Sequence, residues 1–463
     1  MMGTRLYDKE TYFYTLIIIV LIISYLFYYN VWDNAPIISA DSPKYMEIAL
    51  DMEDYHFNEI PVRTLGYPFL LNLFNSEIKP QISLYHMQLF FHFLAIFLFV
   101  VLLKNLNTHN ILIYLFLFFS LIPSSVSSAA FVLTENPTQI CLSLGLFSLL
   151  YFINLKLKIN KLFILWIASI FFALSALIRP TYQLLFVSIS LTLILFTIIY
   201  KTDKIKWLIS ILFINFFSII IIGGYSIFNY NNYNYFGLTP WLGFNLSTKT
   251  VSYIEKIPDE YENIREILIK SRNSDLIKRN SSHTGKMYIW QTVPFLQQST
   301  NLSLVELSKL MRKINLTLIL ENPLDYLVDV AQSMPIFWFP YINHISYFDS
   351  LIIKILLYIL HFIVVSIYFL STILLFLFLS SLLLINKNKE IFINLLNINK
   401  LEIISVALAN SIIFYTMIIS TFFEVGNPRY RDPVNLIIYF SIIVSIHLFN
   451  KIIIPIFRTN NAS

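Results

Sequence analysis

Residues 162–199 read LFILWIASIFFALSALIRPTYQLLFVSISLTLILFTII, an apolar run that only Arg179-Pro180 interrupts. A helix needs about 20 apolar residues to cross a bilayer core of about 30 Å, so this run is long enough for two crossings with a turn at the proline. A guanidinium near the hydrocarbon is costly unless an anion lies beside it. The stretch therefore predicts two membrane helices with an ionic site where they meet.

Eight further apolar runs have lengths that suit membrane helices. The chain has 463 residues, of which 57% are hydrophobic and 13% charged, and its mean hydropathy is +0.69. Such values are typical of polytopic membrane proteins. We expect an all-α polytopic membrane protein with about ten transmembrane helices, in which the short run at 110–122 is a partial or continuing span. The other seven runs lie at about 11–30, 84–103, 138–154, 207–228, 351–385, 401–422 and 434–454.

Two predicted outer segments are too long to be simple turns, and they divide the chain into three parts. Residues 1–228 form an N-terminal transmembrane module whose first outer loop, 31–83, carries short amphipathic helices. Residues 229–350 form a long outer loop, which we expect to be a helical cap. Residues 351–463 supply the C-terminal transmembrane helices.

The long outer loop is neutral, with eleven basic and eleven acidic residues. Its stretches 253–279 and 302–320 have Ile and Leu at helical spacing among charged residues, as in amphipathic helices that lie on a membrane. The aromatic run 334–345 is typical of the headgroup zone. The loop therefore predicts interfacial helices.

The distribution of basic residues predicts the orientation. With the N-terminus inside, the cytoplasmic stretches carry fourteen Lys and Arg residues, whereas the short outer stretches carry six. Cytoplasmic loops are enriched in Lys and Arg. We therefore expect both termini to be cytoplasmic.

Seven ionisable residues lie on or beside apolar segments, all on the predicted non-cytoplasmic side. Ions in such places usually mark a functional cavity, so their shared side predicts one site. The single cysteine, Cys141, lies in an apolar run and offers no disulfide or thiolate metal site. The sequence also contains no nucleotide-binding loop and no paired-His zinc spacing. The seven residues are Asp41, Arg63, Glu135, Arg179, Glu424, Arg429 and Arg431.

The first outer loop contributes two of these ions. Asp41 comes just before a predicted amphipathic helix that includes Tyr45, so it is either a helix cap or a carboxylate that accepts a proton from an acceptor hydroxyl. Arg63 comes shortly before Gly66 and Tyr67, in a tight turn that is able to hold both side chains toward a ligand. The alternative is an ordinary interfacial turn whose Arg reaches the headgroups.

Glu135 and Arg179 lie at the ends of predicted spans. Glu135 is either favourably placed at the positive end of a helix dipole or available to a sugar hydroxyl, a metal or a basic partner. Arg179 is either paired internally, for instance with Glu135, or bound to a phosphate, whose oxygens suit the planar guanidinium. Both alternatives remain open from the sequence alone.

The last outer turn, 424–433, places two arginines and a tyrosine between two apolar helices. Asp432 and Pro433 resemble the cap and first residue of the following helix. Arg429 and Arg431 are then available to bind an anion, and the alternative ligand is a phospholipid headgroup.

These motifs, in their order and shared sidedness, resemble those of the polyprenyl-phosphate-dependent glycosyltransferases of fold class C, including the protein mannosyltransferase and lipid A aminoarabinose transferase relatives. The motifs are Asp41, the sequence RTLGYP at 63–68, Glu135, Arg179-Pro180 and Arg429-Tyr430-Arg431. The resemblance covers roughly 11–228 and 400–455 and leaves out the long loop.

The resemblance implies roles for these residues. Asp41 would be the catalytic general base. The donor phosphate would be held by Arg179, Arg429 and Arg431, and the substrate cavity would be shaped by Tyr45, Arg63, Tyr67, Glu135 and Tyr430. Many relatives have two adjacent acidic residues where this chain has Asp41-Ser42, so no cofactor is assigned, and a divalent cation at Asp41 and Glu135 stays open.

The resemblance also implies an enzyme of a bacterial inner (plasma) membrane, with a periplasmic or extracellular active site. The partners that it implies are a polyprenyl-phosphate-linked sugar, an acceptor glycan, lipid or protein, and membrane lipids, with no nucleic acid. It would transfer a hexosyl or pentosyl group with inversion. The alternatives are a transporter or flippase of lipid-linked saccharides and a polymerase or ligase that uses a lipid-linked oligosaccharide.

Overall fold

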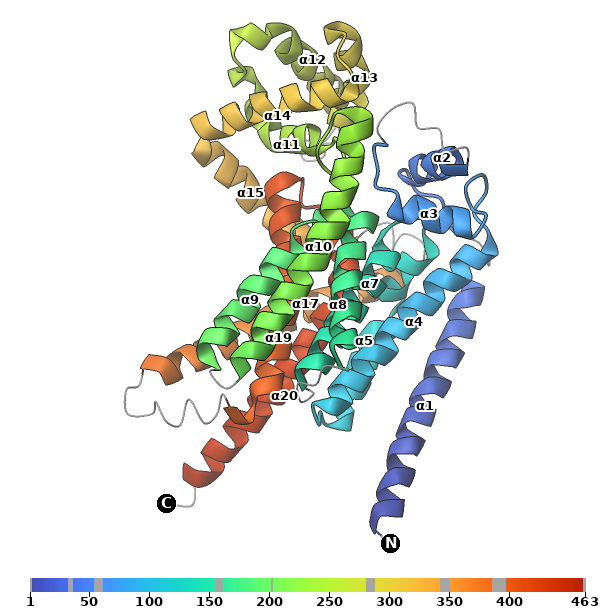
Figure 1. Cartoon of the computed structure of the whole chain (residues 1–463), viewed down its shortest axis with the longest axis vertical. Helices are drawn as coiled ribbons and strands as arrows, with labels where there is room; N and C mark the ends of the chain where they lie inside the picture. The colour runs from blue at the N-terminus through green and yellow to red at the C-terminus, as the bar shows by residue number, and fades with distance from the viewer. Residues whose placement is uncertain are drawn as a thin grey trace.

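The computed structural model describes residues 2–31, 36–53, 61–154, 161–200, 203–279, 288–341, 350–384 and 397–460. These ranges are built from helices and contain no strand, only a single parallel bridge between Ile37 and Phe131. Figure 1 shows a bundle of long helices with a smaller group of helices at one end, and both chain termini at the other end. The predicted all-α architecture is confirmed.

Eight helices in the described part of the chain are long and apolar enough to cross a membrane. Since a helix satisfies its own backbone hydrogen bonds, it is the form in which such segments tolerate lipid. The chain is thus a multi-pass helical membrane protein. The helices are α1 (Met2–Val31), α4 (Ile82–Asn105), α7 (Glu135–Asn154), α9 (Leu185–Ile199) with the turn η3 (Pro180–Tyr182) before it, α10 (Lys204–Tyr233), α17 (Leu351–Leu384), α19 (Lys400–Phe423) and α20 (Asn435–Asn460) with the turn η8 (Pro428–Val434) before it.

Two further apolar segments are helical but shorter or bent. The helix α8 (Leu162–Ile178) has 17 residues. The helix α5 (Asn110–Leu121) is followed by α6 (Pro123–Val126), and the segments on either side of the break differ in direction by 64°. This bend agrees with the prediction of a partial or continuing span there, and the figure of about ten crossings stays a prediction.

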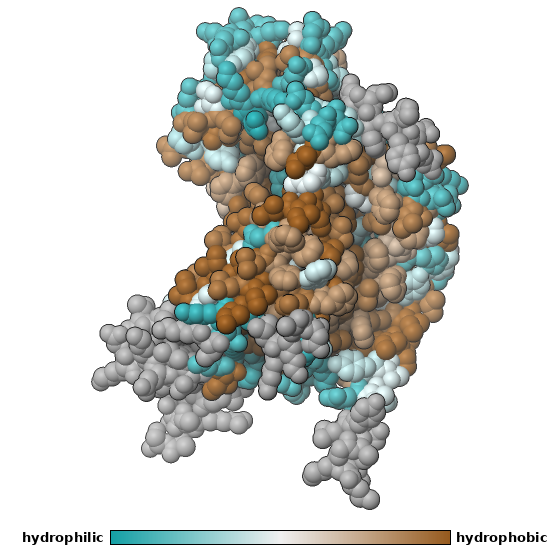
Figure 2. Space-filling model, viewed as in Figure 1, coloured by the Kyte–Doolittle hydropathy of each residue, from teal (hydrophilic) through white to brown (hydrophobic). Residues whose placement is uncertain are grey.

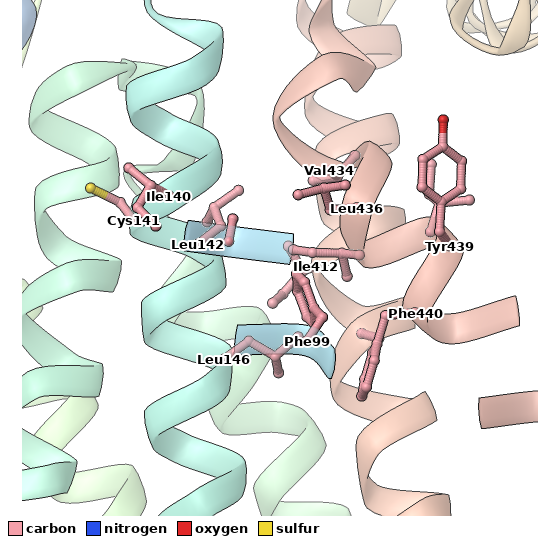
Figure 3. Close-up of a cluster of buried hydrophobic side chains, with 14 of the residues drawn as sticks. Phe99, Ile140, Cys141, Leu142, Leu146, Ile412, Val434, Leu436, Tyr439 and Phe440 are labelled. Atoms are coloured by element: carbon pink, nitrogen blue, oxygen red, sulfur yellow. The ribbon is translucent and has the colours of Figure 1, made fainter. Parts of the chain in front are cut away.

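The helices α7 and α20 form the centre of the bundle. In the most apolar stretch of α7, 83% of the residues are buried, against 17% in α17 at the periphery. Figure 3 shows apolar side chains from α4, α7, α19 and α20 meeting in this centre, and the rings of Phe99 and Phe440 lie 5.0 Å apart. The peripheral helices instead expose large apolar side chains such as Ile352 and Leu212, as expected of surfaces that face lipid.

The cap above the bundle has its own hydrophobic core. It consists of α11 (Leu242–Thr250), α12 (Glu262–Arg279), α13 (Tyr288–Thr300), α14 (Leu304–Glu321) and α15 (Pro323–Trp338). Figure 2 shows hydrophilic residues gathered on its far end, whereas apolar residues cover most of the bundle in this view.

Within the cap, the predicted amphipathic stretches are helices, but their apolar faces have a different partner from the one expected. Leu268 of α12 and Met311 and Leu318 of α14 are buried in the core of the cap. These faces contact other cap helices and are covered by protein. An amphipathic pattern does not distinguish burial against protein from burial in lipid, so the position of the cap on the membrane stays a prediction. Part of the aromatic run at 334–345 lies outside the described residues.

Candidate functional site

The site begins where α8 ends. Pro180 restricts the preceding residue to extended backbone, and Arg179 has φ −141° and ψ 106° as the residue that closes α8. Its guanidinium Nη1 lies 2.8 Å from Oε1 of Glu135 and 3.3 Å from the hydroxyl oxygen of Thr134. Glu135 is the first residue of α7. The internal pairing considered for Arg179 is therefore present.

Arg429 approaches the same carboxylate from the last outer turn. Its Nε lies 2.9 Å from Oε1 of Glu135, so two guanidinium groups share one buried oxygen. The turn is shaped by Gly426, whose φ of +71° favours glycine. The Asn427 side chain then accepts a hydrogen bond from the backbone N–H of Arg429 and caps η8.

Asp41 extends the cluster toward the first outer loop. Its Oδ2 lies 2.6 Å from Nη2 of Arg429, and its Oδ1 lies 3.0 Å from Nη2 of Arg63. The five side chains thus form a continuous chain of ion pairs, in which each carboxylate is bound by two guanidinium groups. The order is Arg179, Glu135, Arg429, Asp41 and Arg63.

Backbone contacts bring Asp41 to the start of α7. Ile37 N–H donates to the carbonyl of Ala130, and Val132 N–H donates to the carbonyl of Ile37. The hydroxyl of Ser42, the first residue of α2 (Ser42–Glu53), donates to the carbonyl of Val132 at 2.8 Å and accepts from the N–H of Ser39. Ser42 therefore anchors the loop, which leaves the Asp41 carboxylate to the arginines.

Arg63 is positioned by the close approach of two backbones. A Cβ added at Gly66, which begins α3 (Gly66–Leu73), would lie 2.5 Å from the carbonyl oxygen of Leu177 in α8. Thr64 also donates to the carbonyl of Ile178 at 3.5 Å. This contact docks the first outer loop beside the end of α8, next to Arg179, and only glycine permits so close an approach.

The cluster has a buried end and an accessible end. The side chains of Glu135 and Arg179 are 2% and 7% exposed, whereas those of Asp41 and Arg63 are 28% and 32% exposed. With three guanidinium groups and two carboxylates, these five side chains together carry one net positive charge. An anion that reached the exposed edge would balance this charge.

Asp41 is held in its ionised form. Burial alone would raise the pKa of this carboxyl, but the charges of Arg429 and Arg63 outweigh burial and lower the pKa below its ordinary value. A carboxylate in this state is a weak base. Its basicity would increase if another anion drew the two guanidinium groups away.

The tyrosines expected in the cavity differ in their access. The ring of Tyr45 lies 5.4 Å from the Arg63 guanidinium and packs edge-on against Tyr67 at 5.3 Å, and both tyrosines are buried. Tyr45 therefore packs against the Arg63 guanidinium, and Tyr67 packs against Tyr45. Tyr430 is partly exposed, and its ring centroid lies 4.9 Å from the guanidinium carbon of Arg179.

The structure does not bring Arg431 into the cluster. Its Nη1 donates to the carbonyls of Phe337 and Phe339 at 2.8 and 3.0 Å, and its Nε donates to Asn435. Arg431 thus joins η8 to the end of α15. Its predicted role at the donor phosphate is not supported by this geometry, because its guanidinium is held by the carbonyls of Phe337 and Phe339 and by Asn435.

Glu424 links the site to the cap. It accepts a hydrogen bond from the side-chain amide of Asn245 in α11 at 3.0 Å. Tyr326 of α15 donates to the carbonyl of Phe422 nearby. The turn that carries Arg429 is therefore fixed by cap residues that the sequence did not single out.

The carboxylates do not suit a divalent cation. Asp41 and Glu135 are each bound by two guanidinium groups, and a metal placed between them would lie next to Arg429. Among the residues whose positions are described, no group of three or more His, Cys, Asp or Glu side chains is arranged to hold a metal. We therefore assign no metal to this site.

Two residues of the site were missed by sequence reasoning. Thr134 accepts from Arg179, and Gln88 accepts from the Tyr67 hydroxyl at 3.1 Å while its amide donates to the carbonyls of Ala129 and Phe131. Thr134 adjoins Glu135 in the sequence, which is a weak signal. Gln88 stands out only as an amide within an apolar helix.

Comparison with known proteins gives no relative. No family model, no curated protein and no solved structure matches the chain. The fold and the site therefore define the protein only as a multi-pass helical membrane protein with a shared cluster of buried ion pairs.

Proposed function

We propose that this protein is a membrane glycosyltransferase that moves a sugar from a polyprenyl-phosphate donor to an acceptor hydroxyl on the non-cytoplasmic face. The observation that supports this proposal is the cluster itself, in which Arg179, Arg429 and Arg63 exceed the carboxylates by one positive charge. Guanidinium groups suit phosphate oxygens. The orientation, with cytoplasmic termini in a bacterial inner membrane, is part of the proposal and rests on the loop charges.

The charge of the cluster favours a particular donor. A sugar joined to a lipid through one phosphate is a phosphodiester with a single negative charge near neutral pH. It would balance the net positive charge of the cluster, whereas a diphosphate-linked sugar would reverse its sign. We therefore assign a monophosphate-linked donor to the site.

Donor binding and base activation are coupled in this arrangement. The donor phosphate competes with the Asp41 carboxylate for Arg429 and Arg63, because both anions need the same guanidinium groups. As these guanidinium groups turn to the phosphate, the pKa of Asp41 rises and its basicity increases. Asp41 then becomes competent only when the donor is present.

The transfer step follows from this geometry. The Asp41 carboxylate takes the proton of the acceptor hydroxyl as its oxygen forms a bond to the anomeric carbon. The bond from that carbon to the phosphate oxygen breaks, and the electron pair leaves with the polyprenyl phosphate. Arg429 and Arg63, the guanidinium groups that turn to the phosphate, stabilise the charge that accumulates on it. Attack from the opposite side would invert the anomeric centre.

The proposal is tested by two measurements, one on a deletion strain and one on the purified protein. In a deletion strain, lipid extracts are expected to accumulate a polyprenyl-phosphate-linked sugar, which identifies the donor. Purified protein in proteoliposomes is then expected to transfer that sugar from a monophosphate-linked donor to membrane acceptors, and the Asp41→Asn variant is expected to insert normally without transfer.

Two outcomes would replace this function with another, and a third would change the mechanism. Movement of the lipid-linked sugar across the vesicle membrane without a new glycosidic bond would indicate a flippase. Accumulation of a lipid-linked oligosaccharide would indicate a polymerase or ligase. Full transfer by the Asp41→Asn variant would remove Asp41 from the mechanism.

A further inference from the structure

One face of α15 is apolar and exposed along its whole length. Leu324 is 76% exposed, Leu327 is 52% exposed and Val328 is 56% exposed. At 100° per residue these positions lie within one stripe, together with Ala331 and Pro335. We call these five residues the α15 stripe. It contains no charged or polar side chain, and all five residues are exposed.

The opposite face of α15 fixes the orientation of this stripe. Asp329 lies 2.7 Å from Nζ of Lys249 in α11, and the Lys249 ammonium also donates to the hydroxyl of Ser333 at 2.8 Å. Both ions are buried, at 4% and 0% exposure of their side chains. The helix therefore presents Asp329 and Ser333 to the cap and its stripe to the surroundings, with the exposed Asp325 and Gln332 beside the stripe.

The lower end of α15 is attached to a membrane helix. The ring of Trp338 stacks on Tyr368 of α17 at 5.2 Å and meets Phe369 edge-on at 4.8 Å. His361, also in α17, donates to the carbonyl of Trp338 at 2.8 Å. The α15 stripe thus leads from the cap to the exposed apolar surface of a membrane span. Figure 2 shows apolar residues on the part of the cap nearest the bundle.

The corner between α14 and α15 extends the same surface. Leu316 and Leu320 in the last turns of α14 are 45% and 79% exposed. Contiguous exposed apolar patches of this kind are unusual on surfaces that face water. A helix with one apolar face and one polar face is the form that lies in a membrane interface.

We propose that the α15 stripe and the adjoining corner of α14 are seated among the acyl chains of the lipid leaflet next to the cap. Lipid is the occupant favoured here, because the stripe leads to exposed rings shared with α17: Phe339, just after α15, is 48% exposed and lies 6.4 Å from Phe362 of α17, which is 46% exposed. The cap is then held against the membrane by α15. This inference rests on the membrane spans and is independent of the proposed glycosyl transfer.

The test places a nitroxide label on the stripe in a Cys141→Ala background, using Leu327→Cys in protein reconstituted into liposomes. The matched control is Asp325→Cys, which lies on the same helix outside the stripe and has a half-exposed side chain. Collision rates of each label are measured with molecular oxygen, which concentrates in lipid, and with a water-soluble nickel complex. The ratio of oxygen to nickel collisions is expected to be several-fold higher at position 327 than at position 325.

Two results would overturn the inference. The label at 327 faces water if it collides with the nickel complex as often as the control label does. A label that neither reagent reaches is covered by protein, which would indicate a second copy of the chain. Leu324→Cys, one turn earlier on the stripe, repeats the measurement if the first variant does not reconstitute.

Discussion

Two ionic sites in the described part of the molecule differ in charge balance and in access. In the cap, Lys249 pairs with Asp329, and their side chains are 0% and 4% exposed. At the top of the bundle, three guanidinium groups share two carboxylates, and exposure rises from 2% at Glu135 to 32% at Arg63. The first site is neutral and enclosed, whereas the second has a surplus positive charge and an accessible edge.

This difference separates a structural ion pair from a candidate binding site. A buried pair that is already balanced offers nothing to a charged ligand, and breaking it costs stability. A cluster with surplus charge has capacity for a further anion, and it can exchange one carboxylate for a phosphate. Burial of charge alone is thus a poor marker of function in this protein.

The comparison is tested most strongly by removing the proposed base. Asp41→Asn is expected to lower the transfer rate by a factor of about 10² to 10⁴, because a positioned general base contributes that much. The rate is measured with the lipid-linked donor in proteoliposomes. The control is Lys249→Met with Asp329→Leu, which is expected to retain transfer per folded molecule. Equal loss in both variants would contradict the division between the two sites.

Breaking the Lys249–Asp329 pair in the cap is expected to lower the stability of the fold. Lys249→Met alone leaves the Asp329 carboxylate buried without its ammonium partner, which costs about 3–5 kcal/mol in comparable pairs. Thermal unfolding in detergent should show a lower Tm. The double replacement Lys249→Met with Asp329→Leu should recover most of the loss. A single variant as stable as the original would mean that Asp329 reaches water.

Removing a guanidinium that both carboxylates share is expected to weaken binding of the donor. Arg429→Gln should weaken binding of a prenyl monophosphate about 10- to 100-fold, in line with about 1.5–3 kcal/mol for a hydrogen bond to a charged group. Arg312→Gln, at an exposed position of α14, is the matched control. Binding is measured by titration of protein in nanodiscs. Equal affinity in both variants would argue against Arg429 as a phosphate ligand.

The effect of pH on stability is expected to be the smallest. The pKa of Asp41 is lower in the folded state, so its pairing with Arg429 and Arg63 stabilises the fold above the unfolded pKa of about 3.9. This contribution is lost as the pH falls through the folded value. The Tm difference between the original protein and Asp41→Asn should stay constant from about pH 5 to 8 and change only in more acidic solution. A change near pH 7 would show that the carboxyl is not paired as described.

The sequence predicted those features that depend on local hydropathy or on the scarcity of ions. Membrane helices were recognisable because each needs a long apolar run, and the pairing of Arg179 with Glu135 was one of the two alternatives that the sequence left open. The bridging position of Arg429 between Glu135 and Asp41 was not predictable. It depends on how the turn at Gly426 packs against Ser333 of α15.

Other predictions differ from the structure for physical reasons. Arg431 was expected to bind the same anion as Arg429, but its guanidinium donates to the carbonyls of Phe337 and Phe339. The cap helices were expected on the membrane surface, yet α12 and α14 bury their apolar faces against protein. A sequence pattern reports that a face is apolar and leaves its partner unspecified.

The central claim is that Asp41 and the donor phosphate compete for the same guanidinium groups. The most direct measurement is the affinity of a prenyl monophosphate for the Asp41→Asn variant in nanodiscs, compared with the original protein. Removing the competing carboxylate should tighten phosphate binding even as transfer is lost. Weaker or unchanged binding in that variant would contradict the account.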